Sequence, residues 1–308
     1  MSKEVLSEFN SLDTDKKQMV EEKYIDASLT DKEWISYLSA VSEYDRGIES
    51  IIKFNSRIAC VFWLLTLAGI GGVLGMSSYG HLYKYAIVLS VLSVGFIAGI
   101  VIFTIKKRRG KKMDIPNTLR EFIMPLMIVL NEECDPKSPV HLVIDLRNVT
   151  GIKDKEVELK KEKGTYGNNL DENYKNPWLK GECGLFDGSK LNWEIIDNIR
   201  FIKITRRKKD KFKTSVKRMI NLSLALKQKN YQTVNQNIEG EGKEKIGVKK
   251  GSGKDVFKMR RVIPYKFKDK TFQTTTEVDK LLDNCILKLQ DFLGLMGMAF
   301  QNVKPAKR

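Results

Sequence analysis

The densest cluster of charged side chains lies in the second half of the chain and could bind phosphate groups. Eight lysines and arginines fall within thirteen positions and are opposed there only by Asp210: Arg206, Arg207, Lys208, Lys209, Lys211, Lys213, Lys217 and Arg218. Such a cationic segment can follow a phosphate backbone or lie on an acidic leaflet, and its binding should weaken as salt rises. The alternative is a solvated loop, and no nucleic-acid-binding motif accompanies the run.

A second set of residues has the order of a metal-dependent nuclease site. Asp145 follows an apolar strand pattern, and Glu158 and Lys160 come later with an E-x-K spacing. In such sites two carboxylates hold Mg²⁺ and a lysine stabilises the attacking water. However, the E-x-K match lies in a segment rich in lysine and glutamate, where this spacing arises by chance. We therefore predict no catalytic site and keep a nuclease using these three residues as the alternative.

The composition leaves little for other catalytic chemistries. The chain has only His81 and His141, and its four cysteines are scattered without a C-x-x-C pair: Cys60, Cys134, Cys183 and Cys285. This pattern supplies no zinc-type ligand set, and it is typical of reduced thiols. No glycine-rich phosphate loop, nucleophile elbow or Ser/His/Asp arrangement occurs. We predict neither a metal site nor a cofactor.

Two long stretches without ionisable side chains determine where the polar residues of the chain can lie. They span 58–76 and 85–105, and eight residues separate them. At about 1.5 Å of rise per residue, a helix over either stretch would cross a hydrocarbon core of roughly 30 Å. Trp63, Tyr79, Tyr83 and Tyr85 near their ends fit the headgroup layers. The chain is therefore expected to form a transmembrane helical hairpin; buried helices of a soluble protein are the alternative.

Basic residues flank this predicted hairpin on one side. Six of the seven residues that follow the second stretch are positively charged: Lys106, Lys107, Arg108, Arg109, Lys111 and Lys112. Lys53 and Arg57 precede the first stretch, whereas the connection offers only Lys84. Because such excess charge stays in the cytoplasm, both termini are expected on the cytoplasmic face of a plasma or inner membrane.

Small residues recur four positions apart within the two stretches. Gly71 and Gly75 form one such pair, and Gly95 and Gly99 form the other. This spacing lets helices approach closely, either within the hairpin or between copies of the chain. We therefore predict these four glycines as packing positions, and a homo-oligomer as one use of them.

The remaining charge is unevenly distributed along the chain. Of the formal net charge of +16, residues 1–57 carry −4 and residues 106–308 carry +19. A cytosolic domain that basic should be attracted to anionic headgroups, or to a nucleic acid or nucleotide ligand, although a general solubility charge is the alternative.

Helical periodicity precedes and follows the hairpin. Thr30 and Glu33 form a capping box, and apolar residues then recur every three or four positions, so one helix should run from about residue 31 into the first stretch. Residues 117–132 predict a helix kinked at Pro125. A further amphipathic helix is expected to begin near Thr274 and Glu277.

The pattern changes to a period of two from Val140. Strands are predicted at 141–147, 182–186, 190–196, 198–205, 219–226 and 256–267, with a tight hairpin turn at Asp187–Gly188. About six strands in this order predict a small antiparallel β-barrel or sandwich with flanking helices. The expected fold is therefore a two-helix membrane hairpin joined to an α+β cytosolic domain.

These elements divide the chain into five regions. The predicted regions are an N-terminal cytosolic helical segment (1–57), the hairpin (58–105), a basic juxtamembrane segment with the kinked helix (106–135), a basic β-rich domain (136–272) with flexible loops at 150–175 and 233–253, and a C-terminal amphipathic helix with its tail (273–308).

The expected function is that of a non-enzymatic, membrane-anchored module that binds an anionic ligand or partner and passes that event to the hairpin. The plan resembles that of bacterial defence effectors that have two spans and a cytosolic sensor, which implies oligomerisation in the membrane. A membrane-tethered nuclease and a lipid-attached scaffold are the alternatives.

Overall fold

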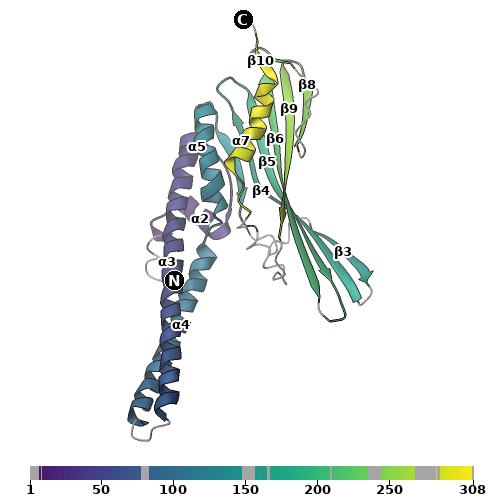
Figure 1. The fold of residues 1–308 in the computed structure, drawn as a ribbon. Helices are drawn as coiled ribbons and strands as arrows, with labels where there is room; N and C mark the ends of the chain where they lie inside the picture. Colours follow the sequence, from purple (N-terminus) through teal and green to yellow (C-terminus); the bar gives the residue numbers. More distant parts are fainter. Residues whose placement is uncertain are drawn as a thin grey trace. The chain divides into compact units, whose positions relative to one another are not determined.

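The computed structural model describes residues 7, 9–77, 83–147, 157–164, 167–208, 210–234, 244–267, 282 and 285–306. The chain divides into two compact units: one comprises Met1–Glu21 and Ala40–Ile115, and the other Glu22–Ser39 and Pro116–Arg308. Helices make up the described part of the first unit, and an antiparallel sheet with short helices makes up the second (Figure 1).

Two long helices dominate the first unit. They are α3 (Asp31–Ser77) and α4 (Tyr83–Met113), and a short helix α2 (Thr14–Glu22) precedes them. Both are long and apolar enough to cross a membrane, judged by length and composition. The predicted capping box opens α3, because the Thr30 amide donates to the Glu33 carboxylate (2.8 Å) and the Glu33 amide donates to the Thr30 hydroxyl (3.3 Å). The single helix predicted from about residue 31 is confirmed.

Within their unit, α3 and α4 pack as an antiparallel pair. A Cβ atom at Gly110 would lie 2.9 Å from Ile52, and one at Gly99 would lie 3.1 Å from the ring of Phe62. A Cβ at Gly72 would lie 2.7 Å from Leu89. Residue numbers rise along one helix as they fall along the other, so the pairing keeps one register over the length of the hairpin. Glycine at these contacts lets the two backbones approach.

Only one of the four predicted packing glycines lies at this contact. Gly99 faces Phe62, but nothing lies within 4 Å of a Cβ built at Gly71, Gly75 or Gly95. Gly69 and Gly72, which the spacing did not single out, are the close-packed glycines of α3: a Cβ at Gly69 would clash with Ser93. A four-residue spacing defines a helix face, but it does not say which face meets the neighbouring helix.

The second unit is built on one antiparallel sheet. Its hydrogen-bonded order is β1-β2-β4-β5-β6-β9-β8. The strand β3 lies off this path and pairs with the first part of β4, from Gly167 to Tyr174. The strands are β1 (Tyr24–Leu29), β2 (Val140–Asp145), β3 (Val157–Gly164), β4 (Gly167–Gly184), β5 (Lys190–Ile204), β6 (Lys211–Lys227), β8 (Glu244–Lys250) and β9 (Lys254–Lys266). A separate pair joins β7 (Tyr231–Thr233) to β10 (Val303–Pro305).

The α+β description is confirmed, but the predicted barrel or sandwich is not what forms. No ladder among the described residues joins the terminal strands β1 and β8, so the sheet is open. Alternation along one strand shows that one face is buried, and it carries no information on whether the first and last strands meet.

Three regional predictions need correction. The N-terminal segment is not purely helical, because β1 pairs with β2 from Tyr24–Asp145 to Leu29–Val140. The predicted loop 150–175 contains β3 and the start of β4, and the loop 233–253 contains β8; residues 150–156 and 235–243 lie outside the described part. Charged residues dominate β3 and β8, and each has only two large apolar residues, so the alternation in their sequence is too short to predict a half-buried strand.

Helices cover the buried face of the sheet. The helix predicted to kink at Pro125 is a π-helical turn, η2 (Leu119–Ile123), followed directly by α5 (Met124–Glu133) with the proline in its first turn. On the same face, α7 (Leu289–Gln301) lies against β6 and β9 (Figure 1). Phe292 of α7 contacts Trp193 and Phe122 edge-on, with ring centroids 6.2 and 6.1 Å apart.

The C-terminal helix that the structure describes is α7. Lys288 has extended backbone (φ −82°, ψ 134°) and residues 285–288 are not helical, so α7 starts at Leu289. The predicted start at Thr274 and Glu277 lies outside the described residues. The Asp187–Gly188 hairpin is confirmed between β4 and β5, with Gly188 at φ +76° and its amide donating to the Leu185 carbonyl (2.8 Å).

The packing of α3 against α4 predicts that two glycines of α4 differ in whether they tolerate a large side chain. Replacing Gly99 by leucine should force the side chain into Phe62 and destabilise the helix pair by about 1–3 kcal/mol. The same change at Gly95 meets open space and serves as the matched control. Thermal unfolding of the full-length protein in detergent should show a lower midpoint for Gly99→Leu alone. Equal midpoints for the two variants would contradict the α3–α4 register described here.

Candidate functional site

The basic cluster predicted after the second apolar stretch forms the last two turns of α4. Arg108, Arg109, Lys111 and Lys112 are exposed, as is Lys106, whose ammonium lies 5.2 Å from the centroid of the Phe103 ring. Lys107 is partly buried and donates to the Ser56 hydroxyl of α3 (2.8 Å). Five of the six predicted cations are thus available to an anionic surface, and the sixth helps to hold the base of the hairpin together.

The second basic cluster forms the hairpin between β5 and β6, in the other unit. Arg206, Arg207 and Lys208 are exposed in the turn, and Lys211, Lys213 and Lys217 are exposed on β6. Lys209 lies outside the described residues. We call these described exposed cations the β5–β6 tip. The only acidic residue of the run, Asp210, pairs with Lys203 of β5 (3.1 Å) and leaves the tip strongly cationic.

Arg218 does not belong to this surface, which corrects its predicted role. Only 2% of its side chain is exposed, and its guanidinium donates to both carboxylate oxygens of Asp197 (2.6 and 2.7 Å). It also lies 5.1 Å from the ring centroid of Trp178 and 5.5 Å from that of Tyr265. Burial by itself lowers the pKa of Arg218, but the hydrogen bonds and charge of Asp197 outweigh it, so the pKa of Arg218 is raised and its guanidinium stays protonated.

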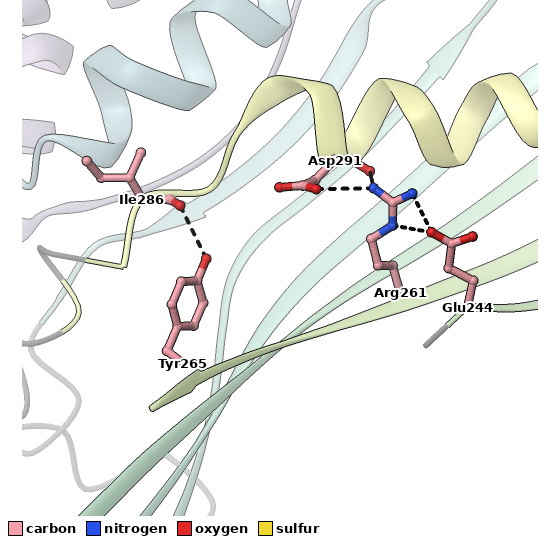
Figure 2. Close-up of polar contacts among 5 residues, drawn as sticks. All are labelled: Glu244, Arg261, Tyr265, Ile286 and Asp291. Atoms are coloured by element: carbon pink, nitrogen blue, oxygen red, sulfur yellow. Dashed lines mark hydrogen bonds and ion pairs between the residues drawn. The ribbon is translucent and has the colours of Figure 1, made fainter. Parts of the chain in front are cut away.

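Arg218 is also one of three side chains that hold the segment before α7 on the sheet. It donates to the Cys285 carbonyl, and the Tyr265 hydroxyl donates to the Ile286 carbonyl (3.2 Å). Figure 2 shows the last of the three: Arg261 lies between Glu244 of β8 and Asp291 of α7, and donates to the backbone carbonyl of Asp291 (2.7 Å). These residues are structural: Arg218 and Tyr265 donate to backbone carbonyls of the extended segment, and Arg261 holds the first turn of α7, which follows it.

The alternative nuclease site is not assembled. Ile144, just before Asp145, pairs with Leu179 of β4, whereas Glu158 pairs with Asn173, six residues further along. At about 3.3 Å per residue, Asp145 and Glu158 lie roughly 16 Å apart along the sheet, too far to share one Mg²⁺ ion. Asp145 is moreover held by Arg147, whose Nε and Nη2 lie 2.9 Å from its two oxygens. Lys160 lies two residues beyond Glu158 on β3, no nearer to Asp145.

The cysteines form no disulfide in the described residues. A hydrogen bond between the thiols of Cys134 and Cys183 lowers the pKa of Cys134 and raises that of Cys183. All four are free thiols; Cys60 is exposed on α3, and Cys134, Cys183 and Cys285 are buried. Burial raises the pKa of Cys285 to about 12, so this thiol stays protonated near neutral pH. No cluster of three or more His, Cys, Asp or Glu side chains that could hold a metal ion occurs in the part of the chain that the structure describes.

A groove that the sequence reasoning missed lies on the polar face of the sheet, opposite α7. Directly paired residues of an antiparallel sheet share a face. Their pairing places two rows there: Glu194, Asn221, Arg260 and Lys245, and beside it Asn192, Ser223, Lys258 and Gly247. These residues, with backbone from the strands between them, line a groove of about 550 Å³ over β5, β6, β9 and β8.

A chain of polar contacts orders one side of this groove. Arg260 donates from Nε to the side-chain oxygen of Asn221 (2.9 Å), and the Asn221 amide lies 3.4 Å from Glu194. Glu194 in turn pairs with Lys180 of β4 (3.1 Å). Lys258 and Arg260 alternate with Met259, so the sequence alone shows that the two cations share a face of β9. It does not show that β9 lies between β6 and β8, because the fold decides which strands pair.

Comparison with protein-family models, with curated proteins and with solved structures finds no match.

The buried Arg218–Asp197 pair predicts a large and specific loss of stability. Asp197→Ala would leave a buried guanidinium without its counter-ion and should lower the free energy of unfolding by about 3–5 kcal/mol. The control is Asp171→Ala, which removes the partner of the exposed Arg200 and should cost about 1 kcal/mol or less. Denaturant unfolding followed by tryptophan fluorescence would compare them, and similar losses for the two variants would refute the structural role given to Arg218.

Proposed function

We propose that this protein is a two-pass membrane protein whose basic sheet unit is a non-enzymatic module for binding an anionic ligand at the cytoplasmic face. In this proposal α3 and α4 cross the bilayer as a hairpin, with both chain termini in the cytoplasm. Ligand binding by the sheet unit is then passed to the hairpin, as in an effector that responds to a signal at the membrane.

The observation that carries the membrane part is the exposure of apolar side chains on α3 and α4. In each helix only 11% of the most apolar 18-residue stretch is buried. Of the 23 exposed large apolar side chains in the described residues, 18 lie between Phe54 and Ile105, with Leu74, Val91 and Val94 each about two-thirds exposed. A soluble protein would lose solubility with such a surface, whereas hydrocarbon is its natural surroundings.

The distribution of polar groups along the hairpin supports the orientation. Among the described residues of the spans, three hydroxyl groups donate to a carbonyl four residues earlier in their own helix: Thr66 to Phe62 (2.8 Å), Ser90 to Ala86 (2.8 Å) and Ser93 to Leu89 (2.9 Å). They therefore need no water. The exposed cations at the end of α4 favour the cytoplasmic side for that end.

The cationic surfaces support the binding part of the proposal. Both the β5–β6 tip and the groove present Lys and Arg side chains that no described carboxylate neutralises, because Asp210 pairs with Lys203 and Glu194 pairs with Lys180. Unneutralised cations attract phosphate-bearing ligands at short and long range. The register of β2, β3 and β4 gives no support to the nuclease alternative, so we do not propose it.

Membrane anchoring predicts that a charged residue is not tolerated in place of an exposed apolar residue of the spans. Val94→Arg places a guanidinium at the lipid-facing surface of α4 and should oppose insertion by about 2.5–3.5 kcal/mol. Phe186→Arg is the matched control, because Phe186 is equally exposed (65%, against 67% for Val94) but lies in the β4–β5 turn. Membrane fractions washed with alkaline carbonate should retain the native protein and the Phe186→Arg variant. They should retain less of the Val94→Arg variant. Native protein that is soluble without detergent would defeat the anchor.

The proposed topology predicts opposite accessibility for the two ends of α4. In a Cys60→Ser background, Lys84→Cys should react with a membrane-impermeant maleimide added to intact cells, because its end of α4 lies outside the cytoplasm. Lys112→Cys, at the basic end, should react only after the cells are broken. Labelling of Lys112→Cys in intact cells would reverse the proposed orientation and move the sheet unit to the other side of the membrane.

A further inference from the structure

The groove on the polar face of the sheet combines a cationic rim with neutral polar groups. Lys245, Lys258 and Arg260 supply three exposed positive charges from β8 and β9. Asn192, Asn221 and Ser223 supply amide and hydroxyl groups from β5 and β6. Cations beside uncharged donors and acceptors match a ligand that carries phosphate on one part and neutral polar groups on another.

Among the described residues, no carboxylate neutralises the rim charges, and one of them is oriented by a neutral partner. No described carboxylate lies within ion-pair distance of Lys245, Lys258 or Arg260. Arg260 is instead positioned by a neutral partner, the Asn221 amide oxygen. The one acidic residue of the lining, Glu194, is compensated by Lys180 from β4, which lies outside the groove lining. An arginine fixed through Nε to a neutral group keeps its remaining N–H donors for an anion.

The shape of the groove limits the size of its ligand. Gly247 pairs with Lys258, and nothing lies within 4 Å of the position that its Cβ would take. A side chain there would stand in the groove, so the glycine keeps this space open. The volume of about 550 Å³ falls within the range of roughly 300–1,000 Å³ that is usual for small-molecule sites.

We propose that this groove binds a phosphorylated small molecule of nucleotide size. Its phosphates lie against Lys245, Lys258 and Arg260, and its uncharged polar groups lie against Asn192, Asn221 and Ser223. The assignment deepens, and rests on, the proposed role of the sheet unit as an anion-binding module. It names this groove, rather than the β5–β6 tip, as the place of specific recognition.

Isothermal titration of the full-length protein in neutral-lipid nanodiscs tests the assignment, with ATP and inorganic tripolyphosphate as probes at constant ionic strength. Saturable binding of one equivalent is expected. Lys258→Glu should weaken it by roughly ten-fold or more, since a phosphate contact is replaced by repulsion. Gly247→Leu should weaken it as much without changing any charge, because the side chain fills the groove.

The control is Lys229→Glu, which makes the same charge change in the exposed turn after β6, outside the groove lining. Its affinity should stay within about two-fold of the native value, since a distant exposed charge is screened by salt. Thermal midpoints of all three variants should match that of the native protein, because each site is exposed and Gly247 has ordinary strand backbone.

Two results would overturn the groove assignment. One is the absence of saturable binding by both probes. The other is equal weakening by Lys258→Glu and Lys229→Glu, which would indicate diffuse attraction to a basic protein. An oligonucleotide that binds more tightly than ATP and tolerates Gly247→Leu would assign anion binding to nucleic acid at another surface. If the protein binds ATP but is not retained in carbonate-washed membranes, the proposed membrane anchor is wrong and the groove assignment still holds.

Discussion

The exposure of apolar side chains along α3 and α4 is the constraint on which the proposed architecture depends. Their backbone groups are satisfied within each helix, and the hydroxyls of Thr66, Ser90 and Ser93 return to their own helix, so no polar group of these three side chains requires water. The packed seam uses Gly69, Gly72 and Gly99 and leaves large aliphatic side chains on the outside. This is the reverse of a soluble helix pair, in which the large side chains fill the seam.

The sheet unit solves a different problem, because its two faces meet different surroundings. On one face, Trp193, Leu222 and Met259 lie beneath α7, and the buried Arg218–Asp197 pair fixes the segment that leads into that helix. The opposite face carries amides, hydroxyls and cations that no described helix covers. A sheet with one closed and one open face can present a fixed set of side chains to a ligand, since the closed face supplies the stability.

The sequence was informative where a pattern is local and silent where a partner is distant. The uncharged stretches, the Thr30–Glu33 cap and the Asp187–Gly188 turn each depend on neighbouring residues, and all could be predicted. Arg218 could not, because its burial depends on Asp197 across the β5–β6 pair, and in the sequence it looked like one more solvated cation. β1 was missed for the same reason: its partner β2 follows more than a hundred residues later. The groove could not be predicted either, because it depends on the strand order β6-β9-β8, which the periodicity of the sequence does not reveal.

The open end of the described sheet has a consequence if the protein is anchored in a membrane, as proposed. β8 is the last strand in the hydrogen-bonded order, and a terminal strand can recruit the same strand of another copy. Anchoring confines copies to a thin layer and raises their encounter rate, so this hazard would grow with expression. The seven residues of β8 include Lys245, Lys249 and Lys250, all exposed. Mutual repulsion between these ammonium groups discourages fibril-like stacking and keeps crowded copies separate.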